Sequence, residues 1–482
     1  MSAFALAPAL LRAETPPPRR PNIVLLMADD WGWAGAQCLD PSKARMPNFA
    51  RFRREGVNFT NAFAAAPSCT ASRGAVLSGQ WPWRLREGAN LQGSLPRDIP
   101  LYTEILANAG YHVGSMRKGW APGSLEAAGR TQNPAGRAYA SFDAFLSERP
   151  KDAAFCFWFG AEDPHRPFEK GSGTASGIDP ASVDVPPYLP DSPAVRSDIA
   201  DYRYCLERLD RDLGDLVARL DRDGELDNTL IVVTGDNGWA FPRAKATLFH
   251  AGWHVPLAVM WKGEVRGGRE SAALVSLIDL AATFLDVAGI ALPQQMNAKS
   301  LMPVLRNPRA PHRPFVLGAT ERHMNGRAVP GQGYPARALR TQHHLFIHNF
   351  RPDRWPAGDP QRTVIDAHRV EDDIWAAFAD IDKGPAKAEI ATRPEFLRYR
   401  ELATGKRPQR MLFDPARDPF DLRNLAADPR HARMVGKLEA RLFSELAATG
   451  DPRVLDPVGD VFDGYRPNAS GAFARPADWS TS

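Results

Sequence analysis

Residues 21–32, "PNIVLLMADDWG", decide the fold. The unbroken apolar run from Asn22 to Ala28 is typical of a central strand in a parallel sheet that is covered on both faces. Similar buried-strand runs follow at "AAFCFWFGA" (153–161) and "NTLIVVTGDNG" (228–238).

Helical patterns alternate with these runs. Several of them end in glycine, which commonly closes a helix. The predicted helices are "MPNFARFRREG" (46–56), "LYTEILANAG" (101–110), 198–221 and "VSLIDLAATFLDVAG" (275–289). Strands alternating with helices over about 290 residues predict an α/β fold: a doubly wound, mostly parallel central sheet with helices on both faces.

The pattern changes after Asn307, where proline and histidine become frequent. The stretch 336–350 predicts a strand or hairpin, and 411–426 predicts a strand, a turn and a helix start. A further helix is expected at 431–450, with one apolar stripe formed by Met434, Leu438, Leu442 and Leu446. We therefore expect a smaller C-terminal α+β domain with an antiparallel sheet.

These patterns divide the chain into residues 1–20, a principal domain at 21–306 and a C-terminal subdomain at 307–482. Residues 1–20 are Ala-rich, then Pro-rich, and resemble a truncated export signal with Ala13 near a plausible cleavage point. This predicts an exported protein, periplasmic or extracellular; a disordered tail on a cytoplasmic protein is the alternative. The apolar stretch is too short to span a bilayer.

Composition excludes several classes of protein. The 482 residues are 44% hydrophobic and 24% charged, the balance of a globular chain, and 60 basic against 56 acidic residues leave a net charge of only +4. No clustered basic face predicts nucleic-acid binding. The cysteines, Cys38, Cys69, Cys156 and Cys205, have neither disulfide-framework nor metal-motif spacing.

Polar residues follow three of the predicted strands: Asp29-Asp30, Asp163-Pro164-His165 and Asp236-Asn237. The carboxyl ends of parallel strands are the usual ligand-binding edge of an open α/β sheet. Adjacent buried carboxylates are costly unless a cation neutralises them. Oxygen ligands from Asp29, Asp30, Asp236 and Asn237 suit Ca²⁺ or Mg²⁺, although each pair alone also fits a solvated turn.

Cys69 lies in a run of small residues, "AAPSCTASRGAVLSG" (64–78). Such a run predicts a tight strand-to-helix junction where the backbone can approach a ligand closely. On local sequence alone, a buried structural cysteine at a helix start is the favoured interpretation, because free cysteine is among the most often buried residues.

Together these stretches resemble the sulfatases, the formylglycine-dependent enzymes of the alkaline-phosphatase superfamily. The resemblance runs from Asn22 to the C-terminal helix and rests on motifs in the family's order: "PNIVLLMADDWG", "PSCTASRGAVLSG", "GYHVGSMRKGW", "DPHRPF", "NTLIVVTGDNG" and "DPFDLRNLA". Extended similarity in "DPHRPFEKGSG", "VDVPPYLPDSPAVRSDIADY", "DNGWAFPRAKATLF" and "YPARALRTQHHLFIHNF" is closest to the heparan N-sulfatases, or sulfamidases.

The resemblance implies a role for each site residue. A maturation enzyme would oxidise Cys69 to formylglycine, whose hydrate binds the metal and attacks sulfur in a sulfated saccharide. Arg73 would hold this group, Lys118 and Lys245 would bind the sulfate oxygens, and His165 would protonate the leaving oxygen or nitrogen. The resemblance also implies one bound divalent cation, Ca²⁺ as in the family, with Mg²⁺ as the alternative. Its ligands would be Asp29, Asp30, Cys69, Asp236 and Asn237.

The sequence departs from the family pattern at three positions. Ala71 replaces the proline of the C-x-P-x-R motif, Lys245 stands where sulfamidases use arginine, and Trp120 replaces a histidine, where it is expected to form an aromatic wall. Similarity near Tyr188 and in 334–350 favours a terminal N-sulfated glucosamine in a pocket closed by the C-terminal domain. There, the "ATERHMNG" stretch predicts Glu321 and His323 as contacts to sugar hydroxyls.

Two other functions compete with a sulfatase. A phosphomonoesterase or phosphonate hydrolase of the same superfamily would usually have a serine or threonine nucleophile and two metals, whereas only one set of metal ligands is evident here. An unconverted Cys69 would instead leave an inactive protein that binds sulfated glycans.

Overall fold

The fold is built around an eight-stranded sheet. It is seen in a computed structural model that describes residues 19–33, 45–360, 366–456, 460–468 and 474–476. The predicted leader lies almost wholly outside these residues, as does Cys38. The sheet order is β4-β3-β5-β1-β6-β7-β2-β8. Its strands are β1 (Asn22–Ala28), β2 (Val57–Phe63), β3 (His112–Arg117), β4 (Arg137–Ala138), β5 (Phe155–Gly160), β6 (Thr229–Gly235), β7 (His254–Met260) and β8 (Arg269–Ser276).

The predicted mostly parallel sheet is confirmed. β1 lies between β5 and β6 and is parallel to both, with Met27 beside Gly160 on one side and Thr234 on the other. β7 alone among these eight strands runs against its neighbours, β6 and β2. Seven carboxyl ends therefore point to one edge of the sheet.

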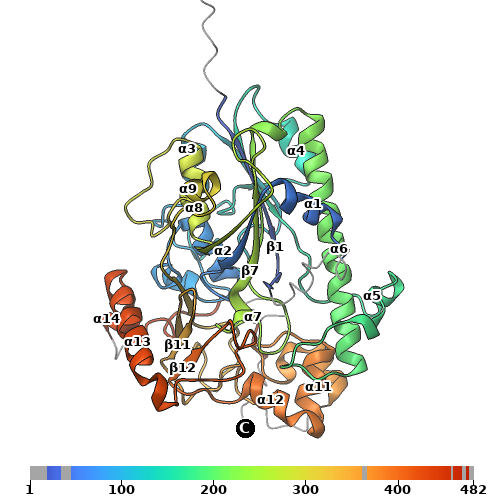
Figure 1. The fold of residues 1–482 in the computed structure, drawn as a ribbon, viewed down its shortest axis with the longest axis vertical. Coiled ribbons are helices and arrows are strands. Elements are labelled where there is room, and N and C mark those ends of the chain that lie inside the picture. Colours follow the sequence, from blue (N-terminus) through green and yellow to red (C-terminus); the bar gives the residue numbers. More distant parts are fainter. Residues whose placement is uncertain (1–18, 34–44, 361–365, 457–459, 469–473, 477–482) are drawn as a thin grey trace, which may run out of the picture.

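Helices cover both faces of the large sheet. They must, because successive apolar side chains of β1 point to opposite faces. Ile23 and Leu25 pack into the cluster on one face, and Val24 and Leu26 into the cluster on the other. In Figure 1, α2, α3, α8 and α9 lie on one side of the sheet, and α1 and α6 on the other. The helices up to this point are α1 (Pro47–Glu55), α2 (Cys69–Ser78), α3 (Tyr102–Asn108), α4 (Phe142–Ser147), α5 (Ser172–Ala175), α6 (Pro193–Arg222), α7 (His250–Trp253), α8 (Asp279–Val287) and α9 (Met302–Arg306).

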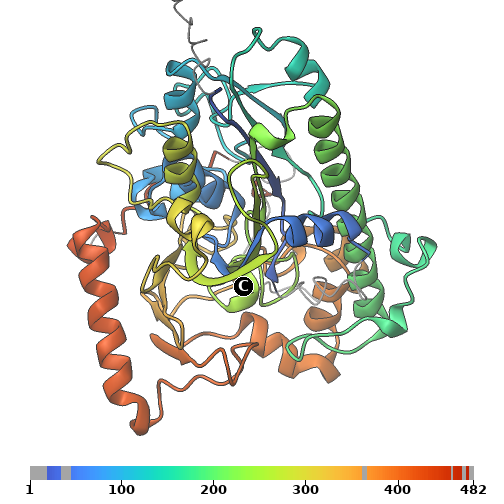
Figure 2. The same cartoon turned by 45° about the horizontal axis from the view of Figure 1, so that its top comes forward.

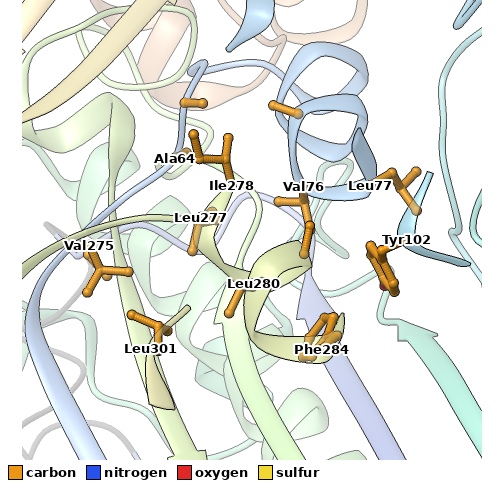
Figure 3. Packing of buried hydrophobic residues seen from close by; sticks show 14 of the residues in the cluster. Ala64, Val76, Leu77, Tyr102, Val275, Leu277, Ile278, Leu280, Phe284 and Leu301 are labelled. Atoms are coloured by element: carbon orange, nitrogen blue, oxygen red, sulfur yellow. The ribbon is translucent and has the colours of Figure 1, made fainter. Parts of the chain in front are cut away.

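The first face has a closely packed apolar core. Val76 and Leu77 of α2 meet Leu280 and Phe284 of α8, and Tyr102 of α3 closes the group (Figure 3). The rings of Tyr102 and Phe284 pack edge-to-face with centroids 5.1 Å apart. This packing fixes α2, and with it the residue at its first position, against the sheet.

A second, four-stranded antiparallel sheet follows, in the order β12-β11-β10-β9, so this prediction is also confirmed. The 336–350 stretch forms the expected hairpin. Figure 2 shows α13 beside this sheet and α6 on the opposite side of the molecule. The remaining elements are β9 (Val316–Thr320), β10 (Ala336–Arg340), β11 (Leu345–Asn349), β12 (Arg410–Phe413), α10 (Ala367–Asp372), α11 (Pro385–Thr392), α12 (Leu397–Thr404), α13 (Ala432–Ala448) and α14 (Pro452–Leu455). The domain division at 306/307 stays a prediction.

Three element predictions need correction. The helix expected from Val275 begins at Asp279, because Val275 and Ser276 pair with β2 as the end of β8. The helix start expected in 411–426 is absent there, and α13 begins only at Ala432. Its buried stripe contains Val435 where Met434 was expected, since Met434 is only half-buried.

The described residues contain no helix with both the length and the apolar character that crossing a bilayer requires.

Candidate functional site

The site lies at the carboxyl edge of the large sheet. Asp29 and Asp30 follow β1, Lys118 follows β3, His165 follows β5, and Asp236 with Asn237 follows β6. Cys69 is the first residue of α2, the helix that follows β2. The predicted residues are thus brought together because parallel strands end at the same edge.

A cluster of possible metal ligands forms at this edge. One ligand atom from each of Asp29, Asp30, Cys69 and His165 lies within 4.8 Å of the others. The Cys69 thiol is 3.5 Å from Asp29 Oδ1. Burial raises the pKa of this thiol well above its usual value, so the unmodified side chain is a neutral thiol near pH 7.

Asp236 and Asn237 are tied to this cluster through Asp30. The Asp30 backbone N–H donates to Asp236 Oδ1 (3.0 Å), and Asn237 Nδ2 donates to Asp30 Oδ1 (2.7 Å). Asn237 Oδ1 is buried and accepts no hydrogen bond from any described residue. A buried, unpaired amide oxygen beside three carboxylates fits a hard divalent cation.

The loop that carries Asn237 depends on Gly238. A Cβ at Gly238 would lie 2.0 Å from the backbone oxygen of Ala251, so no other residue fits without moving α7.

Arg73 lies beneath the carboxylates, with its side chain fully buried. Its Nε donates to Asp236 Oδ2 (2.7 Å), and Nη1 donates to the backbone oxygens of Lys118 (2.6 Å) and Gly119 (2.9 Å). Nη2 lies 3.6 Å from Asp29 Oδ1. Arg73 therefore connects two acidic strand ends to the segment after β3.

Each carboxylate of the Asp29-Asp30 pair has a lysine partner. Lys118 Nζ forms an ion pair with Asp29. Lys245 Nζ lies 2.7 Å from Asp30 Oδ2 and 2.9 Å from Asp382 Oδ2. Burial would raise the pKa of Asp29, but Lys118 leads the cations that outweigh it and hold that pKa well below its usual range.

The pKa of Asp236 is shifted in the opposite direction, above its usual value. Burial raises its pKa, and the nearby Asp29 carboxylate raises it further, although Arg73 opposes both. A cation bound at Asp236 would oppose this effect of burial and lower the pKa of the carboxyl group.

His165 stands at the mouth of this cluster. Its Nδ1 lies 2.5 Å from the backbone oxygen of Arg166, so the proton is assigned to Nδ1. Nε2 then faces Lys245 Nζ at 3.3 Å. The ring is the most exposed of the predicted site residues, with 28% of its side chain accessible.

A cavity of about 460 Å³ opens over these groups. Its walls include Asp29, Cys69, Lys118, His165 and Lys245. The C-terminal half of the chain contributes His323, Met324, Ile374 and Asp382.

Asp382 was not predicted. It pairs with Lys245, yet it lies in the loop sequence "ADIDKG", which follows no strand and matches no motif. His323 was predicted and does line the cavity, where its Nδ1 is 2.9 Å from Ser68 Oγ.

One predicted contact of the sugar pocket is wrong. Glu321 lies outside the cavity, because both its oxygens are bound by Arg337 (2.7 Å) and Arg453 (2.6 Å). The stretches whose similarity favoured an N-sulfated sugar lie behind the cavity: Tyr188 is buried in the core, where its hydroxyl accepts a hydrogen bond from Trp239 (3.1 Å), and residues 336–349 form strands of the second sheet.

Trp120 does not form the expected aromatic wall. The ring is buried against α2, and its Nε1 donates to the backbone oxygen of Thr70 (3.2 Å). The following residues, Ala121 and Pro122, line the cavity in its place.

Two family models match this chain. The family model described as "Sulfatase" matches residues 21–290, and the model "N-sulphoglucosamine sulphohydrolase, C-terminal" matches residues 235–358. The human protein named N-sulphoglucosamine sulphohydrolase is 27% identical over 494 residues, covering 91% of this chain and 92% of the relative.

Solved structures share the fold, which is alkaline-phosphatase-like. One, titled as a complex with its substrate D-glucosamine-2-N,6-O-disulfate, matches with a TM-score of 0.63 and 18% identity over 92% of this chain and 100% of that chain. A phosphonate monoester hydrolase from Silicibacter pomeroyi matches with a TM-score of 0.65 and 18% identity over 90% of this chain and 97% of that chain. The family-model match covers more than half of the sequence, and the chain belongs to the sulfatase family of sulfuric ester hydrolases.

Proposed function

We propose that this protein hydrolyses a sulfate group from a saccharide and that its substrate is a terminal N-sulfated glucosamine. The carrying observation is the position of Cys69: the first residue of α2, beside Asp29 and facing a cavity that also contains Lys118, Lys245 and His165. The 27% identity to the human N-sulphoglucosamine sulphohydrolase over nearly the whole chain supports the N-sulfate.

The proposal includes maturation of Cys69 and a bound divalent cation. A maturation enzyme would convert Cys69 to formylglycine, placing an oxygen nucleophile at the start of α2, where helix N-termini favour negative charge. Asp29, Asp30, Asp236 and Asn237 would hold Ca²⁺ together with this group. When bound, the cation would supply positive charge that favours the anionic nucleophile and the sulfate.

The remaining side chains would bind the sulfate and move one proton. With a divalent cation on the carboxylates, Lys118 and Lys245 would no longer be needed to neutralise Asp29 and Asp30. Their ammonium groups would be available to the sulfate oxygens. In the imidazolium form, which keeps Nδ1–H on the backbone oxygen of Arg166, His165 would deliver the Nε2 proton to the leaving nitrogen or oxygen as its bond to sulfur breaks.

The predicted pocket closure is part of this proposal. His323 and Asp382 reach the cavity from the C-terminal half of the chain, so the 307–482 segment would shape the sugar site. Export of the protein and a dedicated maturation enzyme stay proposals that rest on residues 1–20 and on Cys69.

The test is a kinetic comparison of matured enzyme on N-sulfated and 6-O-sulfated glucosamine. We expect kcat/KM to be higher for the N-sulfate. A preference of about 100-fold for the O-sulfate, or about 2.7 kcal/mol, would reject the N-sulfatase proposal and keep a sulfatase. Turnover of phosphonate monoesters without turnover of either sulfate would favour the phosphonate hydrolase alternative.

Removal of divalent cations is expected to abolish activity, and Ca²⁺ is expected to restore it. Replacing Asn237 with leucine should weaken Ca²⁺ binding by about 10–100-fold, because it deletes the unpaired buried oxygen. Isothermal titration calorimetry on the chelator-treated protein measures this directly.

Asn349→Leu is the matched control for this variant. Asn349 is also a buried asparagine, but it lies in β11 and outside the cavity. Equal Ca²⁺ affinity of wild type and Asn237→Leu would exclude Asn237 from the metal site.

A further inference from the structure

Asp382 places a carboxylate in a cavity that is proposed to bind sulfate. It lines that cavity, and its Oδ2 lies 2.9 Å from Nζ of Lys245, one of the two lysines proposed to bind the sulfate oxygens. Burial would raise the pKa of Asp382, but Lys245 leads the cations that outweigh it and hold that pKa well below its usual range. The group is therefore ionised near pH 7, and on its own it would repel the sulfate.

The ammonium group of Lys245 needs a partner that remains when a cation occupies the acidic cluster. Its Nζ lies 2.7 Å from Asp30 Oδ2, and only 6% of the side chain is exposed. A cation held by Asp30 would compete with Lys245 for the same carboxylate. Asp382 lies outside the proposed set of metal ligands and would keep its contact. A buried charge is costly unless it is paired, so this contact stabilises the lysine in its place.

The lysine side chain cannot fix its own charge in space. Its backbone is held, because the N–H of Lys245 donates to the backbone oxygen of Trp239 (3.2 Å) and that of Ala246 to Pro67 (2.9 Å). The ammonium group, however, ends a flexible four-carbon stem, so the contacts of Nζ decide where the charge lies.

The segment that carries Asp382 is fixed from behind. Lys387 of α11 is only 1% exposed, and its Nζ donates to the backbone oxygen of Ile381 (2.8 Å). Asp380, two residues before Asp382, accepts a hydrogen bond from the buried Arg327 (2.7 Å). Asp382 is therefore a rigid support for a flexible cation.

We propose that Asp382 is a positioning residue, which holds the Lys245 ammonium group where that group meets the sulfate. This rests on the proposed function, because Lys245 must bind the sulfate oxygens. The carboxylate repels the anion, so its benefit to the reaction passes through Lys245. A cation that is already in place costs no reorganisation when negative charge develops in the transition state.

The test is a double-variant cycle on sulfate release from N-sulfated glucosamine by the matured enzyme. Asp382→Asn keeps the size of the side chain and removes its charge, and we expect kcat/KM to fall by about 10–100-fold, because a misplaced group costs this much. Lys245→Met keeps the length of the stem and removes the ammonium group. In this background Asp382→Asn should cause no loss and should raise kcat/KM, since only the repulsion between Asp382 and the sulfate is removed.

Glu55→Gln is the matched control. Glu55 also pairs with a lysine, Lys262 (3.0 Å), but it lies at the end of α1 and outside the cavity, so kcat/KM should not change. Asp382→Glu, which keeps the charge, should retain more activity than Asp382→Asn.

Crystal structures of the Ca²⁺-bound wild type and Asp382→Asn proteins supply a readout besides activity. Nζ of Lys245 should be displaced in the variant or should occupy more than one position. An unchanged Nζ position would overturn the positioning role.

A loss of equal size in the Lys245 and Lys245→Met backgrounds would also overturn it, and the proposed function would stand. The two Lys245→Met proteins can be compared even where Asp382→Asn alone fails to fold, and a loss between them would have the same meaning. Failure of the wild type to release sulfate would contradict the proposed function and this inference together.

Discussion

Replacing Cys69 with alanine is expected to lower kcat/KM for sulfate release by at least about 10⁴-fold, because it removes the precursor of the nucleophile. The fold should survive, since the side chain is buried but makes only one weak polar contact, 3.5 Å from Asp29. Sulfate release by the matured variant measures the activity, and its thermal unfolding checks the fold.

The matched control is Cys156→Ala. Cys156 is also a buried cysteine, but it lies in β5 and has no role in the proposed reaction. This variant should retain activity within a few-fold. Mass spectrometry of the Cys69 peptide from wild type supplies an independent readout. Full activity with an unmodified Cys69 would contradict the maturation step, even if the alanine variant were inactive.

Replacing Arg337 with alanine is expected to lower the free energy of unfolding by about 3–5 kcal/mol, because it removes the ion pair of the buried Asp451 and one of the two arginines bound to the buried Glu321. Arg337 of β10 is fully buried and forms ion pairs with Glu321 (2.7 Å) and with Asp451 (2.6 Å). Urea unfolding followed by tryptophan fluorescence measures the loss.

Arg51→Ala is the control for this variant. Arg51 pairs with Glu55 at 2.6 Å, but 64% of its side chain is exposed, and solvent screens such a pair so that its loss should change stability very little. A similar loss for both variants would mean that burial of the Arg337 cluster adds nothing. A stable Arg337→Ala protein would show that Arg453 alone neutralises Glu321.

The large sheet was predictable because its central strands are long apolar runs that no surface element would tolerate. The acidic cluster was predictable for a related reason: each carboxylate directly follows such a strand, and parallel strands bring those ends together. The start of α8 was harder, because Val275 and Leu277 continue a helical pattern that only pairing with β2 interrupts.

The sugar pocket was predicted poorly because local sequence does not report long-range pairing. Glu321 is a polar residue in a loop, and only Arg337 and Arg453 reaching it from other elements remove it from the surface. Trp120 likewise follows the site lysine in sequence but turns its ring inward toward α2. Asp382 reaches Lys245 only through tertiary packing.

The central position of β1 has a consequence for the order of folding. The first strand of the chain needs β5, which ends at Gly160, and β6, which ends at Gly235, on its two sides. During synthesis, the backbone hydrogen-bonding groups on both edges of β1 would therefore stay unpaired until about half of the protein has been made. Unpaired apolar strands invite aggregation, and contacts between distant residues form slowly. In a nascent chain that stops before Gly235, β1 lacks one neighbouring strand, so Asp29 and Asp30 are not held in position. Chaperone binding to the chain during this part of synthesis should therefore govern the yield of active protein.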